Sequence, residues 1–118
     1  MPKTFDWTVP ETGKIGSRDY VVKAFDCGPL VVHHNLKDVD RGALRPKWNV
    51  AHKATGMTVR VTSIPNARVA RILAYALLAL DIPWNAQTQE EFGKGYDPNG
   101  ADAKAMRGIW ELAYQLAN

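Results

Sequence analysis

Three histidines and one cysteine are the side chains of this 118-residue chain best suited to metal or nucleophilic chemistry. His33 and His34 are adjacent in a β-rich stretch, and His52 lies in another. Neighbouring strand residues point to opposite faces of a sheet, so His33 and His34 are not expected to share a metal ion. If their strands pair, His34 and His52 would meet and, with an aspartate, form a zinc or acid–base site. The candidate aspartates are Asp26, Asp38 and Asp40.

Cys27 is the candidate nucleophile, but a catalytic thiol also needs a histidine and an orienting group beside it, and the spacing shows neither. The chain has no P-loop, dinucleotide fingerprint, H-E-x-x-H or G-x-S-x-G motif. One cysteine excludes an intramolecular disulfide and a multi-thiolate zinc site. We therefore predict ordinary sheet histidines, a structural cysteine, no cofactor, no metal and no enzymatic activity. A small metal or Cys/His enzyme using Cys27, His34 and His52 is the less favoured alternative.

Strands are the first elements that would position these residues. Alternating or β-rich residues predict strands over 4–9, 20–25 and 30–36, and the polar segment 37–46 is predicted to be a loop. The clearest pattern is a hairpin in which residues 48–53 and 57–62 alternate around Gly56. One of its faces is apolar, and the other carries Asn49, Lys53, Thr58, Arg60 and Thr62. This pattern predicts a sheet that is covered on one side only.

Helical patterns fill the C-terminal half. Ser63 is the predicted N-cap of a helix that ends at 81–83, with an apolar stripe comprising Val69, Ile72, Leu73, Ala76, Leu77 and Leu80. Capping-box spacing from Thr88 to Glu91 predicts a short helical turn that Gly93 and Gly95 stop. A final helix is predicted over about 101–117, with a buried stripe comprising Met106, Ile109, Trp110, Ala113 and Leu116.

Together these elements predict an α+β fold, with an antiparallel sheet of three to four strands and two main C-terminal helices packed on one face. The length and the 46% hydrophobic content suit a single domain over 1–118. The longest apolar run, 72–80, is far shorter than the ~20 residues of a membrane span, and the N-terminus lacks a secretory pattern. We therefore expect a cytoplasmic protein without a membrane partner.

Charge is unevenly distributed along the chain, whose net charge is +3. Residues 41–80 hold seven basic and no acidic side chains, so the rest of the chain carries −4. Arg68, Arg71 and Tyr75 would share one strip of a helix, near an N-terminus that disfavours cations. The pattern predicts an anion-binding surface, and the alternative is a solvated face neutralised by distant acids. The predicted binding residues are Arg41, Arg45, Lys47, Lys53, Arg60, Arg68, Arg71, Tyr75 and Trp84. Trp84 is expected to be an exposed loop anchor, and Tyr96 is a second loop aromatic of this kind.

The stretch from Trp48 to Val59 resembles a W-x-V-x-H-x-x-T-G-x-x-V hairpin that precedes a helix in small phage and prophage proteins, and 30–33 resembles their preceding strand. The likeness covers about half of the chain and carries over no functional residue. It implies a phage or mobile-element accessory protein, a group that includes anti-CRISPR and other anti-defence inhibitors. We therefore expect a non-enzymatic phage-type protein that inhibits or modulates a host protein or nucleoprotein complex. The alternative is direct DNA or RNA binding through the basic hairpin and helix face.

Overall fold

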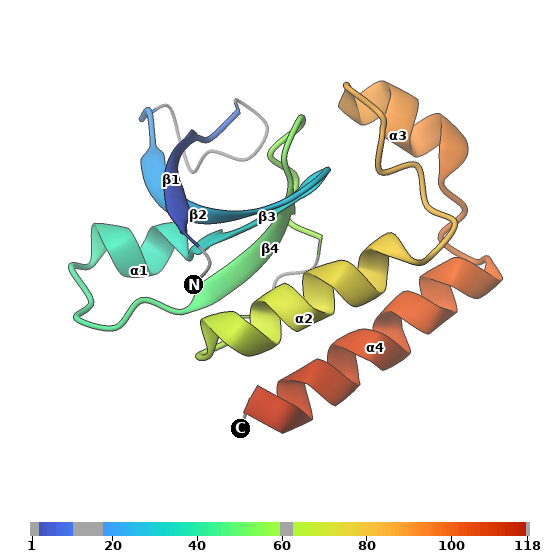
Figure 1. Cartoon of the computed structure of the whole chain (residues 1–118). Helices are drawn as coiled ribbons and strands as arrows, with labels where there is room; N and C mark the ends of the chain where they lie inside the picture. The colour runs from blue at the N-terminus through green and yellow to red at the C-terminus, as the bar shows by residue number, and fades with distance from the viewer. Residues whose placement is uncertain (1–2, 11–17, 60–62, 118) are drawn as a thin grey trace.

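The computed structural model describes residues 3–10, 18–59 and 63–117, with backbone only at 110, 113, 114, 116 and 117. Its sheet contains four strands that lie side by side in chain order, each antiparallel to the next. The strands are β1 (Thr4–Thr8), β2 (Val21–Cys27), β3 (Leu30–His34) and β4 (Trp48–His52). Helix α2 (Ala67–Leu78) crosses one face of the sheet, and α4 (Ala101–Ala117) runs alongside α2 (Figure 1). The predicted α+β fold is confirmed.

Tight turns and caps explain how the first elements connect. Gly28 has a φ of +69°, which suits the two-residue turn between β2 and β3. The chain then enters α1 (Leu36–Asp40), where the Asn35 side chain accepts a hydrogen bond from the Asp38 backbone N–H at 3.1 Å. The prediction of a loop over 37–46 was wrong for the part that α1 occupies. The capping asparagine, directly before α1, is the local signal for this helix.

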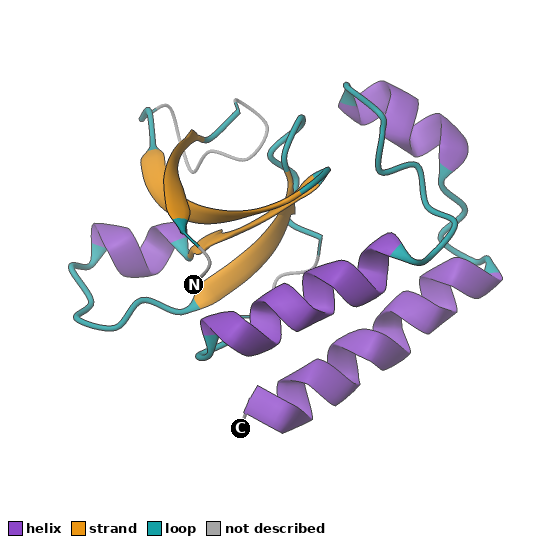
Figure 2. Ribbon diagram, viewed as in Figure 1, coloured by secondary structure: helices purple, strands orange, loops and turns teal. Residues whose placement is uncertain are grey.

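The sheet is buried on both faces in its central part. On the α2 side, Leu30, Val32 and Val50 join a core with Leu73 and Leu77. On the other side lies a second core, formed by Trp7, Val9, Tyr20, Val22, Ala24, Val31, Leu36 and Ala51. The prediction of one solvent-facing side was therefore wrong for β4. Residues of β1 and α1 cover that side, and the sheet bends around it (Figure 2).

His33 belongs to the second face and is 3% exposed. Its ring lies 5.1 Å from the Trp7 ring, and its Nδ1–H donates to the His34 carbonyl at 2.8 Å. Because a carbonyl oxygen only accepts, Nδ1 carries the hydrogen of the neutral ring. Burial lowers the pKa of His33 to about 4, although the bond to His34 opposes this shift. His33 is thus a neutral core residue at pH 7.

The buried His33 makes stability depend on pH. Above pH ~6.5 the ring is neutral in both states, whereas between pH ~6.5 and about 4 only the unfolded chain takes up the proton. We expect the free energy of unfolding to fall by about 3 kcal/mol across this window, as followed by urea denaturation. His33→Phe should remove most of the slope, and His34→Gln should keep it. Parallel profiles for the wild type and His33→Phe would contradict the assignment.

Gly56, with a φ of +77°, makes the predicted turn after β4. The return segment is irregular: Thr58 forms an isolated bridge with Ala51, and Ile64 forms one with Trp48. The predicted continuous strand over 57–62 is therefore wrong for residues 57–59, and residues 60–62 lie outside the described part. The Ile64 bridge brings the segment before α2 against the start of β4.

Helix α2 begins later than predicted. Asn66, not Ser63, caps it by accepting from the backbone N–H groups of Arg68 and Val69 at 2.9 and 3.3 Å. The Ser63 hydroxyl instead accepts from the Asn35 side chain at 3.0 Å. Ile72 was predicted to belong to the apolar stripe of the helix, but its side chain is 58% exposed, so that prediction was wrong. None of the described helices is long and apolar enough to cross a membrane.

The remaining helices begin where their sequence patterns predict, but Gly93 lies inside α3, so the prediction that it stops this helix was wrong and the helix ends at Gly95. Thr88 caps α3 (Gln89–Gly95) by accepting from the Glu91 backbone N–H at 3.1 Å, as predicted. In α4, Met106 and Ile109 are half-buried against the core on the α2 side. The other predicted stripe side chains of α4, at 110, 113 and 116, lie outside the described residues.

Candidate functional site

The histidine pair proposed from the sequence does not form. His34 pairs with Trp48 and His52 pairs with Leu30, so the two histidines lie at opposite ends of β3 and β4, roughly 13 Å apart along the strands. His52 is 2% exposed and uses both ring nitrogens. Its Nε2–H donates to the Trp84 carbonyl at 2.6 Å, and its Nδ1 accepts from the Thr55 hydroxyl at 2.8 Å. His52 therefore has no free lone pair for a metal.

The three candidate aspartates bind side chains other than the histidines. Asp26 pairs with Lys53 at 2.6 Å and Asp38 pairs with Arg41 at 2.8 Å. Asp40 accepts from the Tyr20 hydroxyl at 2.7 Å, and this bond raises the pKa of the tyrosine. The described residues contain no group of three or more His, Cys, Asp or Glu side chains placed to hold a metal ion. These contacts leave the less favoured alternative, a zinc or acid–base site, without its ligands.

Cys27 is a core residue at the end of β2, with 1% of its surface exposed. Burial raises the pKa of its thiol, although the Tyr75 hydroxyl and nearby cations counteract the shift. A thiol that is both protonated and inaccessible is a poor nucleophile. The structure therefore gives Cys27 the packing role that we predicted from the sequence.

Thiol labelling tests this role of Cys27. At pH 8 we expect a disulfide reagent such as dithionitrobenzoate to react with the folded protein at least about a hundredfold more slowly than with the urea-unfolded chain. An exposed-thiol peptide serves as the rate standard. A folded-state rate near that of the standard would show an accessible thiolate and revive the nucleophile hypothesis.

The basic residues of the segment 41–80 divide into those that form ion pairs and those that form none within the described residues. The Asp38 and Asp26 pairs partly neutralise Arg41 and Lys53, as the alternative interpretation predicted. The Lys47 backbone N–H also donates to Asp38, which lowers the pKa of that carboxyl group. Arg45 and Arg68 are exposed and form no ion pair within the described residues. Arg60 lies outside the described part of the chain.

Arg45 and Arg68, which form no ion pair with a described residue, lie toward one end of the molecule. Arg45 precedes β4, and Arg68 is in the first turn of α2. The Trp48 and Ile64 backbones exchange hydrogen bonds of 2.8 and 2.9 Å, so the entry to β4 runs beside the entry to α2 (Figure 1). This chain path places positive charge around the N-terminal end of α2 without acidic partners on that helix.

Arg71 links α2 to a row of rings on the sheet. Its guanidinium lies 4.7 Å from the centre of the Phe25 ring, and its Nε is buried without a hydrogen-bond partner among the described residues. The Phe25 ring lies 5.3 Å from Trp48, which lies 4.1 Å from His34. All four side chains are partly exposed. The guanidinium thus lies over the Phe25 ring, and its partly exposed side chain still has N–H donors to offer a partner.

Exposed apolar side chains lie next to these cations. Arg68, Ile72 and Tyr75 occupy successive turns on the solvent side of α2, and Ile72 and Tyr75 are 58% and 59% exposed. We call Phe25, Arg68, Arg71, Ile72 and Tyr75 the α2 surface. Lys23 lies on the same face of β2 as Phe25. Its charge is neutralised by an ion pair with Asp6 at 2.8 Å. The α2 surface thus combines arginine, tyrosine and a large aliphatic side chain, the types that favour partner binding.

Two predicted loop anchors are not exposed. Trp84 is 6% exposed, and its indole N–H donates to the Leu77 carbonyl at 3.0 Å. Tyr96 is half-buried against the core. Trp84 is therefore removed from the predicted partner surface, and Ile72 and Phe25, which sequence reasoning missed, are added. The position of Ile72 beside Arg68 on the helical wheel, one turn further along the helix, was the available signal for its exposure.

Searches among protein-family models, curated proteins and solved structures find no match to this chain. The α2 surface therefore rests on its own geometry. It brings together three of the predicted binding residues, Arg68, Arg71 and Tyr75.

Proposed function

We propose that this chain is a non-enzymatic, phage-type binding protein that inhibits or modulates a host protein or nucleoprotein complex through its α2 surface. One observation supports this most: α2 exposes Ile72 and Tyr75 beside two arginines, one of them stacked on Phe25. Tyrosine and arginine are the residues that most often dominate binding energy at protein interfaces. The phage type and the inhibitory role rest on the resemblance of the Trp48–Val59 stretch.

The apolar centre of the α2 surface favours a protein partner over direct nucleic-acid binding. Contacts to a phosphate backbone need a dense set of free cations and give no use to an exposed aliphatic side chain. Here Lys53, Arg41 and Lys23 are engaged with aspartates, whereas Ile72 is open to solvent. We infer a partner face that is apolar at its centre and acidic opposite Arg68 and Arg71.

Affinity capture with and without nuclease tests the proposed function. The protein is immobilised and exposed to an extract of the host cell, once untreated and once after complete nuclease digestion. We expect the same saturable protein partner in both cases. Retention of nucleic acid alone, loss of the partner after digestion, or no saturable partner at all would overturn the proposal.

A further inference from the structure

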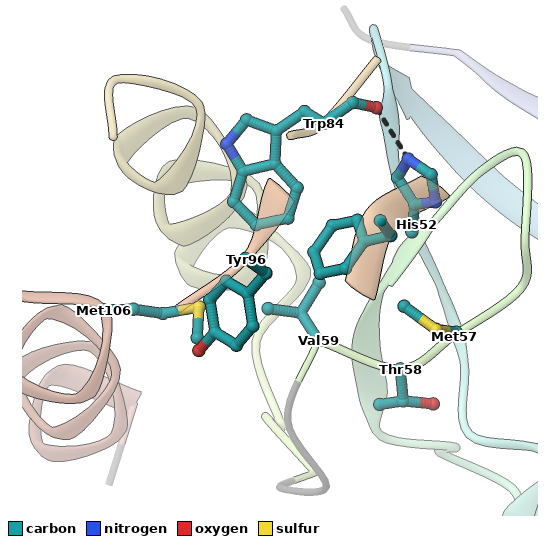
Figure 3. A pocket seen from close by; sticks show the side chains of 8 residues that line it. His52, Met57, Thr58, Val59, Trp84, Tyr96 and Met106 are labelled. Carbon is teal, nitrogen blue, oxygen red and sulfur yellow. Dashed lines mark hydrogen bonds between the residues drawn. The ribbon is translucent and has the colours of Figure 1, made fainter. Parts of the chain in front are cut away.

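A second possible site lies near the C-terminal end of α2, away from Arg68. A cavity of about 90 Å³ opens between the end of β4, α3 and α4. The Trp84 and Tyr96 rings border it together with the thioethers of Met57 and Met106, and these side chains converge from four separate segments (Figure 3). A cavity walled by rings and thioethers favours apolar and especially aromatic contacts.

The described residues that line the cavity include no acidic side chain and no lysine or arginine. His52 lines the cavity, but both its ring nitrogens are already bonded to Thr55 and Trp84. Among the described residues that line the cavity there is no carboxylate to balance a cation and no lysine or arginine to balance an anion. Because burying an unpaired charge is costly, the chemistry selects a neutral ligand.

Two hydroxyl groups supply polarity without charge. Thr58 and Tyr96 both line the cavity, and neither hydroxyl has a hydrogen-bond partner among the described residues. A small number of such groups in an apolar pocket is what orients a ligand. The two hydroxyl groups therefore suit a ligand that carries one polar group on an otherwise apolar molecule.

The size of the cavity and its α3 wall limit the ligand to one ring. An apolar cavity of ~150 Å³ is known to take up benzene, and this one is smaller but open on one side. Phe92 attaches α3 by ring contacts of 5.9 Å to Trp84 and 5.6 Å to Tyr96, and no residue of α3 is buried. A small displacement of α3 would therefore enlarge the cavity without opening the sheet core.

We propose that this cavity binds a small, neutral, single-ring aromatic molecule that carries one hydroxyl or N–H group, held by the Trp84 and Tyr96 rings and hydrogen-bonded to Thr58 or Tyr96. The site is independent of the α2 surface and of the partner proposed for it.

Fluorine NMR with defined probes tests the site on the whole protein. We expect 4-fluorophenol to bind saturably with a Kd of about 1 mM or tighter. Both 4-fluorobenzoate and 4-fluorobenzylammonium should bind at least about tenfold more weakly, because their charges find no counter-ion. No saturation by 4-fluorophenol at about 10 mM, or tighter binding of a charged probe, would overturn the proposal.

Variants locate the binding in the cavity. Val59→Phe, which fills it, should weaken 4-fluorophenol at least about tenfold, while Leu112→Ala on the exposed side of α4 should leave the Kd unchanged. The double variant Thr58→Val/Tyr96→Phe removes both hydroxyl groups and keeps the ring, so it should weaken 4-fluorophenol about threefold or more without weakening fluorobenzene. This second variant is decisive if Val59→Phe does not fold. Unchanged binding of 4-fluorophenol to a folded Val59→Phe, or to Thr58→Val/Tyr96→Phe in its place, would overturn the assignment.

Discussion

Replacing Trp84 with alanine is expected to lower the free energy of unfolding by about 4 kcal/mol. The indole is 6% exposed and joins the core on the α2 side of the sheet. Its N–H donates to the last turn of α2 at Leu77, and its carbonyl accepts from the buried His52. Removing the ring leaves a hole at the junction of sheet and helix and an unpaired helix-end carbonyl. Urea denaturation at pH 7 measures the loss.

Two matched variants serve as controls for the Trp84→Ala measurement. Trp84→Phe keeps most of the apolar ring and removes the N–H donor, so we expect a smaller cost of about 1–2 kcal/mol. Val21→Ala truncates a side chain that is 61% exposed and should cost within about 0.5 kcal/mol. A cost under about 1 kcal/mol for Trp84→Ala would mean that the ring is an exposed loop anchor, as the sequence had suggested.

Local patterns were sufficient for most of the elements. Alternation predicts β1 and β4, Gly56 predicts the turn after β4, and the Thr88 cap predicts α3, because each depends on neighbours along the chain. The burial of Trp84 shows the limit of prediction from local patterns. It lies between Pro83 and Asn85 in a segment without periodicity, and its burial depends on contacts with residues 7 and 32 positions away.

The candidate site was predictable only in part, for the same reason. The pair of Arg41 with Asp38 is local, at a spacing of three residues, and could have been anticipated. The pair of Lys53 with Asp26 spans 27 residues and exists because β3 brings both strand ends together. Likewise, Arg71 meets Phe25 only once α2 packs on the sheet. Charge counted along the chain therefore located the basic segment but not which of its cations remain free.

The double variant Arg68→Glu/Tyr75→Ala is expected to weaken partner binding about a thousandfold. Each interface hot spot of these residue types costs at least about 2 kcal/mol when removed, and the reversed charge adds repulsion with an acidic partner face. Both side chains are exposed, so the free energy of unfolding should change by less than about 1 kcal/mol. Calorimetric titration of the captured partner gives the Kd, and urea denaturation checks the fold.

A matched variant on α4 makes this measurement decisive for the α2 surface. Lys104→Glu/Leu112→Ala also reverses one exposed charge and truncates one exposed apolar side chain, and Leu112 is 59% exposed, like Tyr75. The most direct test is the ratio of the two Kd values for the same partner. We predict a loss of about a thousandfold for the α2 variant and less than about threefold for the α4 variant. Equal losses, or wild-type affinity in the α2 variant, would contradict the claim that α2 carries the binding surface.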